Sequence, residues 1–209
     1  MKKTWVAGLV LLGMASLRVS AGEVGIFADK LVGTTQAVNT GVQLGGQPLT
    51  AGSFNSISPT GYGVRLGYSL LNLEVLDIGV VGTYHPNVKG NVVLAGQTLG
   101  VLQQQYAAVG IQADWTFLLN LHAGVEYRAE KLNFEGDAPF TSQTVNYYRP
   151  WMNAGIGLSL PLPVVKPFVR LEVAVPVNKT ATTVTSSSTD LIKAMAPTVQ
   201  VSLYGGIRF

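Results

Sequence analysis

The sequence predicts an all-β fold, an eight-stranded antiparallel up-and-down transmembrane β-barrel. Three observations point to this class. The 209-residue chain is 47% hydrophobic but only 12% charged, about half the charged fraction of an ordinary soluble domain. Beyond residue 21, no apolar run reaches the roughly 18 residues that a membrane helix needs. Alternation of apolar and polar residues recurs instead, which gives strands two chemically different faces.

Residues 1–21 have the pattern of a secretory signal peptide, with a basic start, a short apolar run and a small-residue cleavage site. Removing Lys2, Lys3 and Arg18 from the 14 basic residues leaves 11, against 11 acidic ones. We therefore expect no nucleic-acid partner. Without Cys, the chain has neither a disulfide framework nor a lipidated N-terminal Cys. The predicted organisation is a signal peptide at 1–21 and a barrel domain at 22–209.

Eight alternating segments form the predicted strands, and the connections between them sort by length. Three connections are tight, four are long and polar, and the two kinds alternate along the chain. Short turns at one end and long loops at the other are typical of outer-membrane barrels. The predicted strands are 23–32, 61–71, 73–85, 105–117, 121–134, 147–160, 166–179 and 196–209. The tight connections are 71–72, 118–120 and 161–165, and the long ones are 33–60, 86–104, 135–146 and 180–195.

Ten charged residues occupy the polar phase of these strands and are predicted to face the lumen. An Arg or Lys facing lipid at the midplane would cost about 2–4 kcal/mol. Eight strands leave an interior that side chains just fill, and buried charges need partners. The sequence therefore predicts an internal salt-bridge network, with a gated or narrow polar channel as the alternative. The ten residues are Arg65, Asp77, Asp114, Glu126, Arg128, Glu130, Arg149, Arg170, Glu172 and Arg208.

Aromatic residues sort by height along the predicted strands, as they do at membrane interfaces. Tyr62, Tyr84 and Tyr148 mark the outer interface, and Trp115 and Phe117 mark the periplasmic one.

The last segment, Val201 to Phe209, ends on an aromatic residue. With this strand, the strand count and the loop pattern, residues 22–209 resemble the small eight-stranded outer-membrane barrels of Gram-negative-type bacteria. That group is the OmpA/OmpX type, with OmpW-like porins as near relatives. The resemblance implies an integral outer-membrane protein in contact with lipid and lipopolysaccharide, and we expect a monomer. It also implies that Tyr204 and Phe209 belong to a signal read by the barrel-assembly machinery.

Two histidines are the only conventional bases near neutral pH. His122 is interpreted as a polar lumen residue, and His85, which precedes Pro86, as a solvated residue at the rim. No acidic or histidine cluster has metal-ligand spacing, so we predict no catalytic site, metal or cofactor. The favoured function is a structural or surface-interaction barrel with a filled lumen. The alternatives are a narrow porin-like channel for small solutes and, less favoured, a lipid-modifying enzyme.

Overall fold

The computed structural model describes residues 22–33, 35–55, 57–73, 75–116, 119–160, 162, 164–178 and 187–209. The predicted signal peptide at 1–21 and the predicted interface residue Phe117 lie outside these residues.

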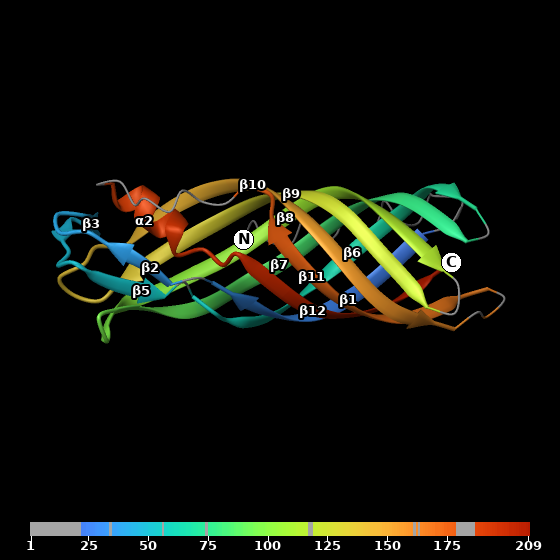
Figure 1. The fold of residues 1–209 in the computed structure, drawn as a ribbon, viewed down its shortest axis with the longest axis horizontal. Coiled ribbons are helices and arrows are strands. Elements are labelled where there is room, and N and C mark those ends of the chain that lie inside the picture. The colour runs from blue at the N-terminus through green and yellow to red at the C-terminus, as the bar shows by residue number, and fades with distance from the viewer. Residues whose placement is uncertain are drawn as a thin grey trace, which may run out of the picture.

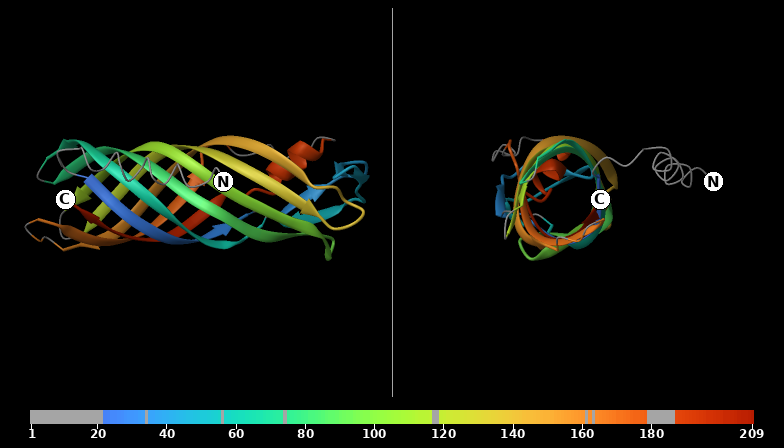
Figure 2. Two further views of the ribbon diagram at one scale, coloured as in Figure 1. Left: turned by 180° about the vertical axis from the view of Figure 1, so that it is seen from behind. Right: turned by 90° about the vertical axis from the view of Figure 1, so that its right-hand side faces the viewer.

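Eight antiparallel strands form a closed ring, which confirms the predicted fold class. Each strand pairs with its neighbours in chain order, and β1 pairs with β12 from Glu23↔Arg208 to Val32↔Val199, which closes the ring. The view along the long axis shows this ring directly (Figure 2). The barrel strands are β1 (Gly22–Val32), β6 (Thr60–Asn72), β7 (Leu76–Leu94), β8 (Gln97–Thr116), β9 (Asn120–Gly136), β10 (Gln143–Ser159), β11 (Lys166–Pro176) and β12 (Val199–Arg208).

The predicted loop at 86–104 is wrong, because β7 and β8 continue through it as one long hairpin. The hairpin turns at Ala95 and Gly96, both with positive φ (49° and 84°), the backbone geometry of a type I′ turn. A bulge between His85 and Val88 shifts the register. An inserted residue exchanges the two faces of a strand, so the alternation changes phase there and imitates a loop.

Other predicted boundaries also move. The first turn comprises residues 73–75 rather than 71–72, with the Leu73 N–H bonded to the Leu76 carbonyl. The connection at 135–146 shortens to 137–142. β11 stops at Pro176, where proline cannot donate to the ladder, and β12 begins at Val199 rather than at residue 196.

The two ends of the barrel differ in structure. The end with the three short turns also holds the start of β1 and the end of β12, where Gly22 and Phe209 exchange backbone hydrogen bonds of 2.8 and 3.1 Å. We call it the turn end, and the opposite end the loop end (Figure 1). The loop end carries further elements: β2 (Thr35–Val38), β3 (Gln43–Leu44), β4 (Gln47–Pro48), β5 (Gly52–Asn55) and α2 (Ser188–Ala194).

Among the described residues, no helix is both long enough and apolar enough to cross a membrane.

An apolar core closes the loop end, and the sequence analysis did not foresee it. Ser187 caps helix α2, because its hydroxyl accepts from the Asp190 N–H at the start of the helix. Its Leu191 and Ile192 are fully buried against the loop-end parts of the barrel strands and of β2–β5. We call this cluster the dome. Its buried members are Val38, Val42, Leu44, Leu49, Phe54, Ile57, Val92, Leu94, Leu99, Leu102, Leu132, Phe134, Val145, Leu191, Ile192, Ala194, Met195 and Ala196.

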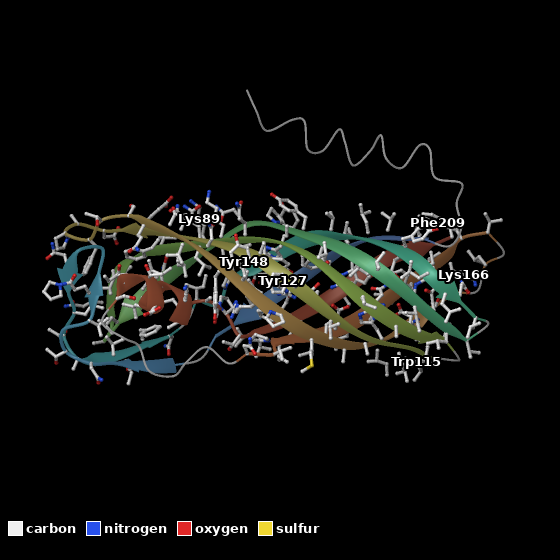
Figure 3. The ribbon with its side chains drawn as sticks, turned by 90° about the horizontal axis from the view of Figure 1, so that it is seen from above. Lys89, Trp115, Tyr127, Tyr148, Lys166 and Phe209 are labelled. Carbon is white, nitrogen blue, oxygen red and sulfur yellow. The ribbon has the colours of Figure 1, made fainter. Side chains whose placement is uncertain are left out.

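Between the dome and the turn end, the barrel is polar inside and apolar outside. Val109 is 68% exposed, whereas Arg128 is 1% exposed. The described residues proposed as interface aromatics all point outward and are exposed, namely Tyr62, Tyr84, Tyr148 and Trp115. Along the long axis, Tyr148 lies near Lys89 toward the loop end, and Trp115 lies near Phe209 at the turn end (Figure 3).

Candidate functional site: the ionic lumen

The turn-end half of the lumen holds a group of mutually paired charges, which we call the lower ionic cluster. Arg65 of β6 makes two 2.8 Å hydrogen bonds to Glu172 of β11. These strands are not neighbours in the ring, so the pair crosses the interior. Fork-to-carboxylate bonds of this kind are both strong and directional. The members of the cluster are Glu23, Arg65, Asp114, His122, Arg170, Glu172 and Arg208.

Two arginines hold the rest of the lower ionic cluster together. Arg170 lies 2.9 Å from Asp114, 3.3 Å from Glu172 and 3.9 Å from Glu23. Arg208 donates a 2.8 Å hydrogen bond to Glu23 and forms an ion pair with Asp114 at 2.9 Å. Every carboxylate in the cluster therefore contacts at least one guanidinium, which offsets the desolvation of charges this deeply buried.

Tyr204, proposed as part of an assembly signal, is built into the same cluster. Its hydroxyl donates a 2.8 Å hydrogen bond to Glu23, and its ring lies 5.1 Å from the Arg65 guanidinium and 4.9 Å from that of Arg170. Both distances fit cation–π contacts. In the folded barrel Tyr204 therefore has an internal structural role.

His85 is not at a solvated rim, which corrects the sequence interpretation. The residue is fully buried. Its Nε2 lies 3.1 Å from Asp29, and its ring stacks on Tyr106 with centroids 5.0 Å apart. The amide of Gln200 bonds both Asp29, at 2.5 Å, and the Tyr106 hydroxyl, at 3.1 Å. The bulge that follows His85 carries the strand onward, so a residue before proline does not mark the edge of the barrel here.

Toward the dome, four residues form the upper ionic cluster: Glu126, Arg128, Glu130 and Arg149. Arg149 bonds Glu130 at 2.9 and 2.6 Å, and Arg128 pairs with Glu126. The Arg128 guanidinium also lies 3.9 Å from the Trp151 ring centre. Glu130 further accepts from the Trp151 indole N–H at 3.1 Å. Arg128 and Arg149 are each 1% exposed, so these contacts replace solvent.

Thr83 connects the two clusters, because its hydroxyl lies 3.3 Å from Arg65 Nε and 3.5 Å from Glu126. Next to these clusters, the Phe27 ring occupies space inside the barrel that Gly63 leaves free. A Cβ at Gly63 would lie 2.3 Å from the Phe27 ring and 2.7 Å from the Tyr84 carbonyl. Only glycine lets the Phe27 ring occupy this part of the lumen.

Asp77 differs from the other nine predicted lumen charges. It is only half-buried, forms no ion pair with any described residue, and accepts a 2.7 Å hydrogen bond from Ser69. It lines a small polar cavity at the turn end together with Asp114 and Arg208. The cavity has a volume of about 10 Å³, which is room for about one water molecule.

Glu23 and Asp29 belong to the interior in addition to the ten predicted residues. Each is 4% exposed. For Asp29 the sequence already predicts this position, because an outward phase of Val24, Ile26 and Ala28 leaves Asp29 inside. The signal was available in β1, where residues 23, 25, 27 and 29 share one face of the strand. Counting them, the buried acids of the described lumen are Glu23, Asp29, Asp114, Glu126, Glu130 and Glu172.

The described residues do not assemble a recognisable reactive site. No group of three or more His, Cys, Asp or Glu side chains among them is placed to hold a metal ion. His122 contacts Asp114 and Asn153 at 3.1 Å each and Glu172 at 3.6 Å. These partners are carboxylate and amide oxygens, whereas covalent catalysis of acyl transfer pairs the base with a hydroxyl or thiol.

Comparison with solved structures places this geometry among known folds. The outer membrane protein OprG from Pseudomonas aeruginosa matches with a TM-score of 0.52 at 11% identity, over 91% of this chain and 92% of that one. The chain has the fold of a small outer-membrane β-barrel. Ail, the attachment invasion locus protein of Yersinia pestis, matches at 15% identity over 90% and 98% of the two chains, with a TM-score of 0.44. Neisserial surface protein A matches at 11% identity over 91% and 98%, with a TM-score of 0.45.

No protein-family model matches the sequence, and no curated protein matches it either.

Proposed function

We propose that this chain is an integral protein of the bacterial outer membrane, exported by the signal peptide at 1–21, with a closed lumen and a structural or surface-interaction role. On this proposal the turn end faces the periplasm and the dome faces the exterior of the cell. The observation that carries it is the double closure of the barrel, by paired charges inside and by a packed apolar dome at the loop end.

The two closures support a barrel that does not conduct. Arg65 and Arg170 are held by ion pairs that cross the lumen, with Glu172 and Asp114 respectively. The polar cavity at the turn end has room for about one water molecule. At the other end the dome is tied to β10, because Gln143 bonds Ser188 at 2.8 Å and Thr189 at 3.2 Å. A solute would have to displace both.

In this proposal the outer surface of the dome is what the protein presents to its surroundings. The barrel anchors that surface in lipid and lipopolysaccharide, and a terminal strand ending at Phe209 is read by the barrel-assembly machinery. No catalytic step is assigned, and the chain acts as a monomer.

Single-channel recording in planar bilayers tests the proposal. Folded protein, verified by its mobility on unboiled gels, should give no reproducible open level in symmetric potassium chloride. A stable conductance from wild-type protein would refute the closed lumen and favour a narrow porin-like channel. Lipid hydrolysis or acyl transfer by the purified protein would instead support the lipid-modifying alternative.

A further inference from the structure

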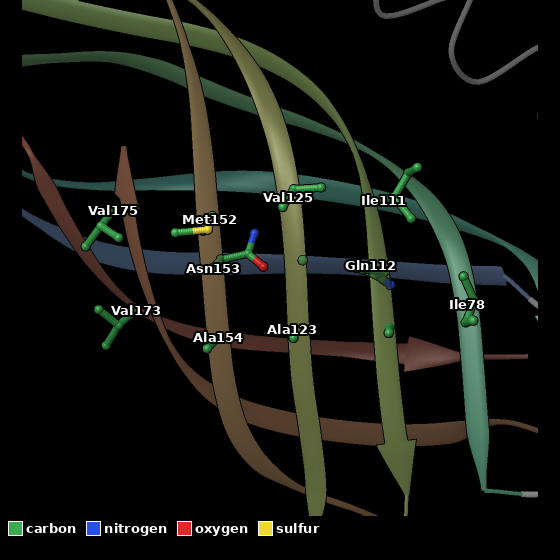
Figure 4. Close-up of a pocket in the computed structure, with 12 residues that line it drawn as sticks. Ile78, Ile111, Gln112, Ala123, Val125, Met152, Asn153, Ala154, Val173 and Val175 are labelled. Atoms are coloured by element: carbon green, nitrogen blue, oxygen red, sulfur yellow. The ribbon is translucent and has the colours of Figure 1, made fainter. Parts of the chain in front are cut away.

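A shallow groove crosses the apolar exterior of the barrel over β8, β9 and β10 (Figure 4). It exists because alanine occupies one register position on three adjacent strands. Ala113 pairs with Ala123, and Ala123 pairs with Ala154. The outward rows on both sides carry large side chains, so the alanines form the floor of a depression. The wall toward the loop end consists of Ile111, Val125 and Met152, and the row toward the turn end of Trp115, Leu121 and Ile156.

The size and chemistry of the groove suit a hydrocarbon chain better than a protein. Its volume is about 670 Å³, within the range of about 300–1,000 Å³ typical of small-molecule sites. Twelve residues line it, whereas a stable protein interface takes about 20–30 residues on each side. The side chains that point outward along it are all apolar, so a partner gains dispersion contacts there but no hydrogen bonds.

The same outward face of β9 ends in groups that suit a lipid head group. This face of β9 runs from Ala123 in the groove through Val125 and Tyr127 to the exposed Lys131. Tyr127 stacks on Tyr148, with ring centres 6.4 Å apart. Lys131 pairs in register with Gln105 and Asn146 on the neighbouring strands. These three outward residues offer one positive charge flanked by two amides.

The separation of the two parts agrees with the dimensions of a lipid. Ala123 and Lys131 are eight residues apart on one strand. At about 3.3 Å per residue and a tilt of about 40°, this is about 20 Å of membrane depth. The groove then lies near the middle of a hydrocarbon core about 30 Å thick, where the tails of outer-leaflet lipids end.

We propose that the groove holds one acyl chain of an outer-leaflet lipid whose anionic head group is bound at Lys131. The site would make this lipid a fixed component of the protein's surface rather than one of its exchanging neighbours. The proposal rests on the membrane insertion proposed above and adds a specific lipid position to it.

Photolabelling in vesicles tests the site. Folded protein is reconstituted into phosphatidylcholine containing a trace of phosphatidylglycerol with a diazirine on its acyl chain, and labelled residues are mapped by mass spectrometry. We expect labelling to concentrate on Val125 and Met152, relative to Leu203, an exposed apolar residue on β12. A lysine near an anionic membrane surface contributes about 1 kcal/mol of binding free energy, which corresponds to about a fivefold change in affinity. Lys131→Gln should therefore lower groove labelling about fivefold. A diazirine phosphatidylcholine should label the groove as weakly as that variant does.

Matched substitutions separate the groove from the rest of the exterior. The double variant Ala123→Leu/Ala154→Leu fills the floor and should abolish the excess labelling. Ala28→Leu, the same change at an exposed position of β1 on the opposite side of the ring, should leave it intact. Uniform labelling of Val125, Met152 and Leu203 would overturn the site while leaving insertion established. Labelling of Leu203 with Val125 and Met152 protected would overturn it in favour of a second copy covering the groove, and absence of labelling at all three positions would count against membrane insertion itself.

Discussion

Replacing Arg149 with methionine should be among the most destabilising single changes in the lumen. Arg149 makes two hydrogen bonds to Glu130, of 2.9 and 2.6 Å, and both side chains are 1–2% exposed. Methionine keeps much of the volume but removes the charge. Among the described residues, Glu130 then keeps hydrogen bonds from two neutral donors, Gln104 at 2.9 Å and Trp151 at 3.1 Å. Arg128 remains a nearby positive charge but makes no hydrogen bond to Glu130 among these contacts. A buried charge left without its partner costs about 3–5 kcal/mol, so we expect a loss of that size in the free energy of unfolding.

A double variant distinguishes the ion pair from simple packing. In Arg149→Met/Glu130→Gln no charge remains unpaired at this site, so the combined loss should be smaller than the sum of the single losses. Residues in one hydrogen-bonded network typically couple by about 0.5–3 kcal/mol. Lys89→Ala is the control, because Lys89 is exposed and surface changes usually stay within about 0.5 kcal/mol.

Urea unfolding of protein folded into phosphatidylcholine vesicles measures these differences. Tryptophan fluorescence reports directly on the site, since the Trp151 ring centre lies 4.9 Å from the Arg149 guanidinium. Mobility on unboiled gels gives a second probe of the folded barrel. If Arg149→Met were as stable as Lys89→Ala, or if the double variant lost the full sum of the single effects, the pairing argument would be refuted.

Further predictions follow from other parts of the structure. Arg128→Ala removes a guanidinium packed on Trp151 and should raise ion conductance in planar bilayers from the closed level; an unchanged silent trace would mean that the dome alone seals the barrel. Leu191→Asp puts a charge into the dome, where Leu191 is fully buried, and should expose loop-end sites to protease while the barrel keeps its gel mobility. Deleting Phe209 should slow assembly, measured as the rate of appearance of the heat-modifiable form, and wild-type kinetics would contradict the proposed signal. Gly63→Ala should destabilise the barrel by a few kcal/mol in urea titration, since its Cβ would overlap the Phe27 ring.

The barrel was predictable because every strand repeats one local pattern, with apolar residues on its outer face and polar residues on its inner face. A charge such as Arg170 must face inward, so its phase in β11 reveals the lumen without any knowledge of its partners. The pairing itself was not predictable. Arg65 meets Glu172 across the interior because of the stagger between strands. The two residues are 107 positions apart, and the sequence around either of them does not indicate how the strands are staggered.

The dome and the position of His85 escaped prediction for a related reason. The short strands β2–β5 show no long periodic pattern, because each of them contributes at most one buried side chain to a shared core. Their burial depends on α2 arriving from the far end of the sequence. His85 was misplaced because the phase change caused by one inserted residue cannot be recognised when strict alternation is assumed, and His85 lies immediately before this bulge.

On the proposed membrane insertion, the dome also supplies an argument for where the membrane ends. Removal from water is the main driving force for apolar burial, so a packed cluster of leucine and valine at the loop end is expected where the surrounding is aqueous. On β7, Val80 lies toward the turn end and is 40% exposed on the outer face of the strand. Val88 and Val92 lie toward the loop end and are buried, at 7% and 0% exposed. The exterior changes at the same level, because Gln103 bonds Asn87 and Glu135 on neighbouring strands there. Both faces of the wall therefore change chemistry just above the row of outward tyrosines, as expected if these tyrosines lie at the outer interface.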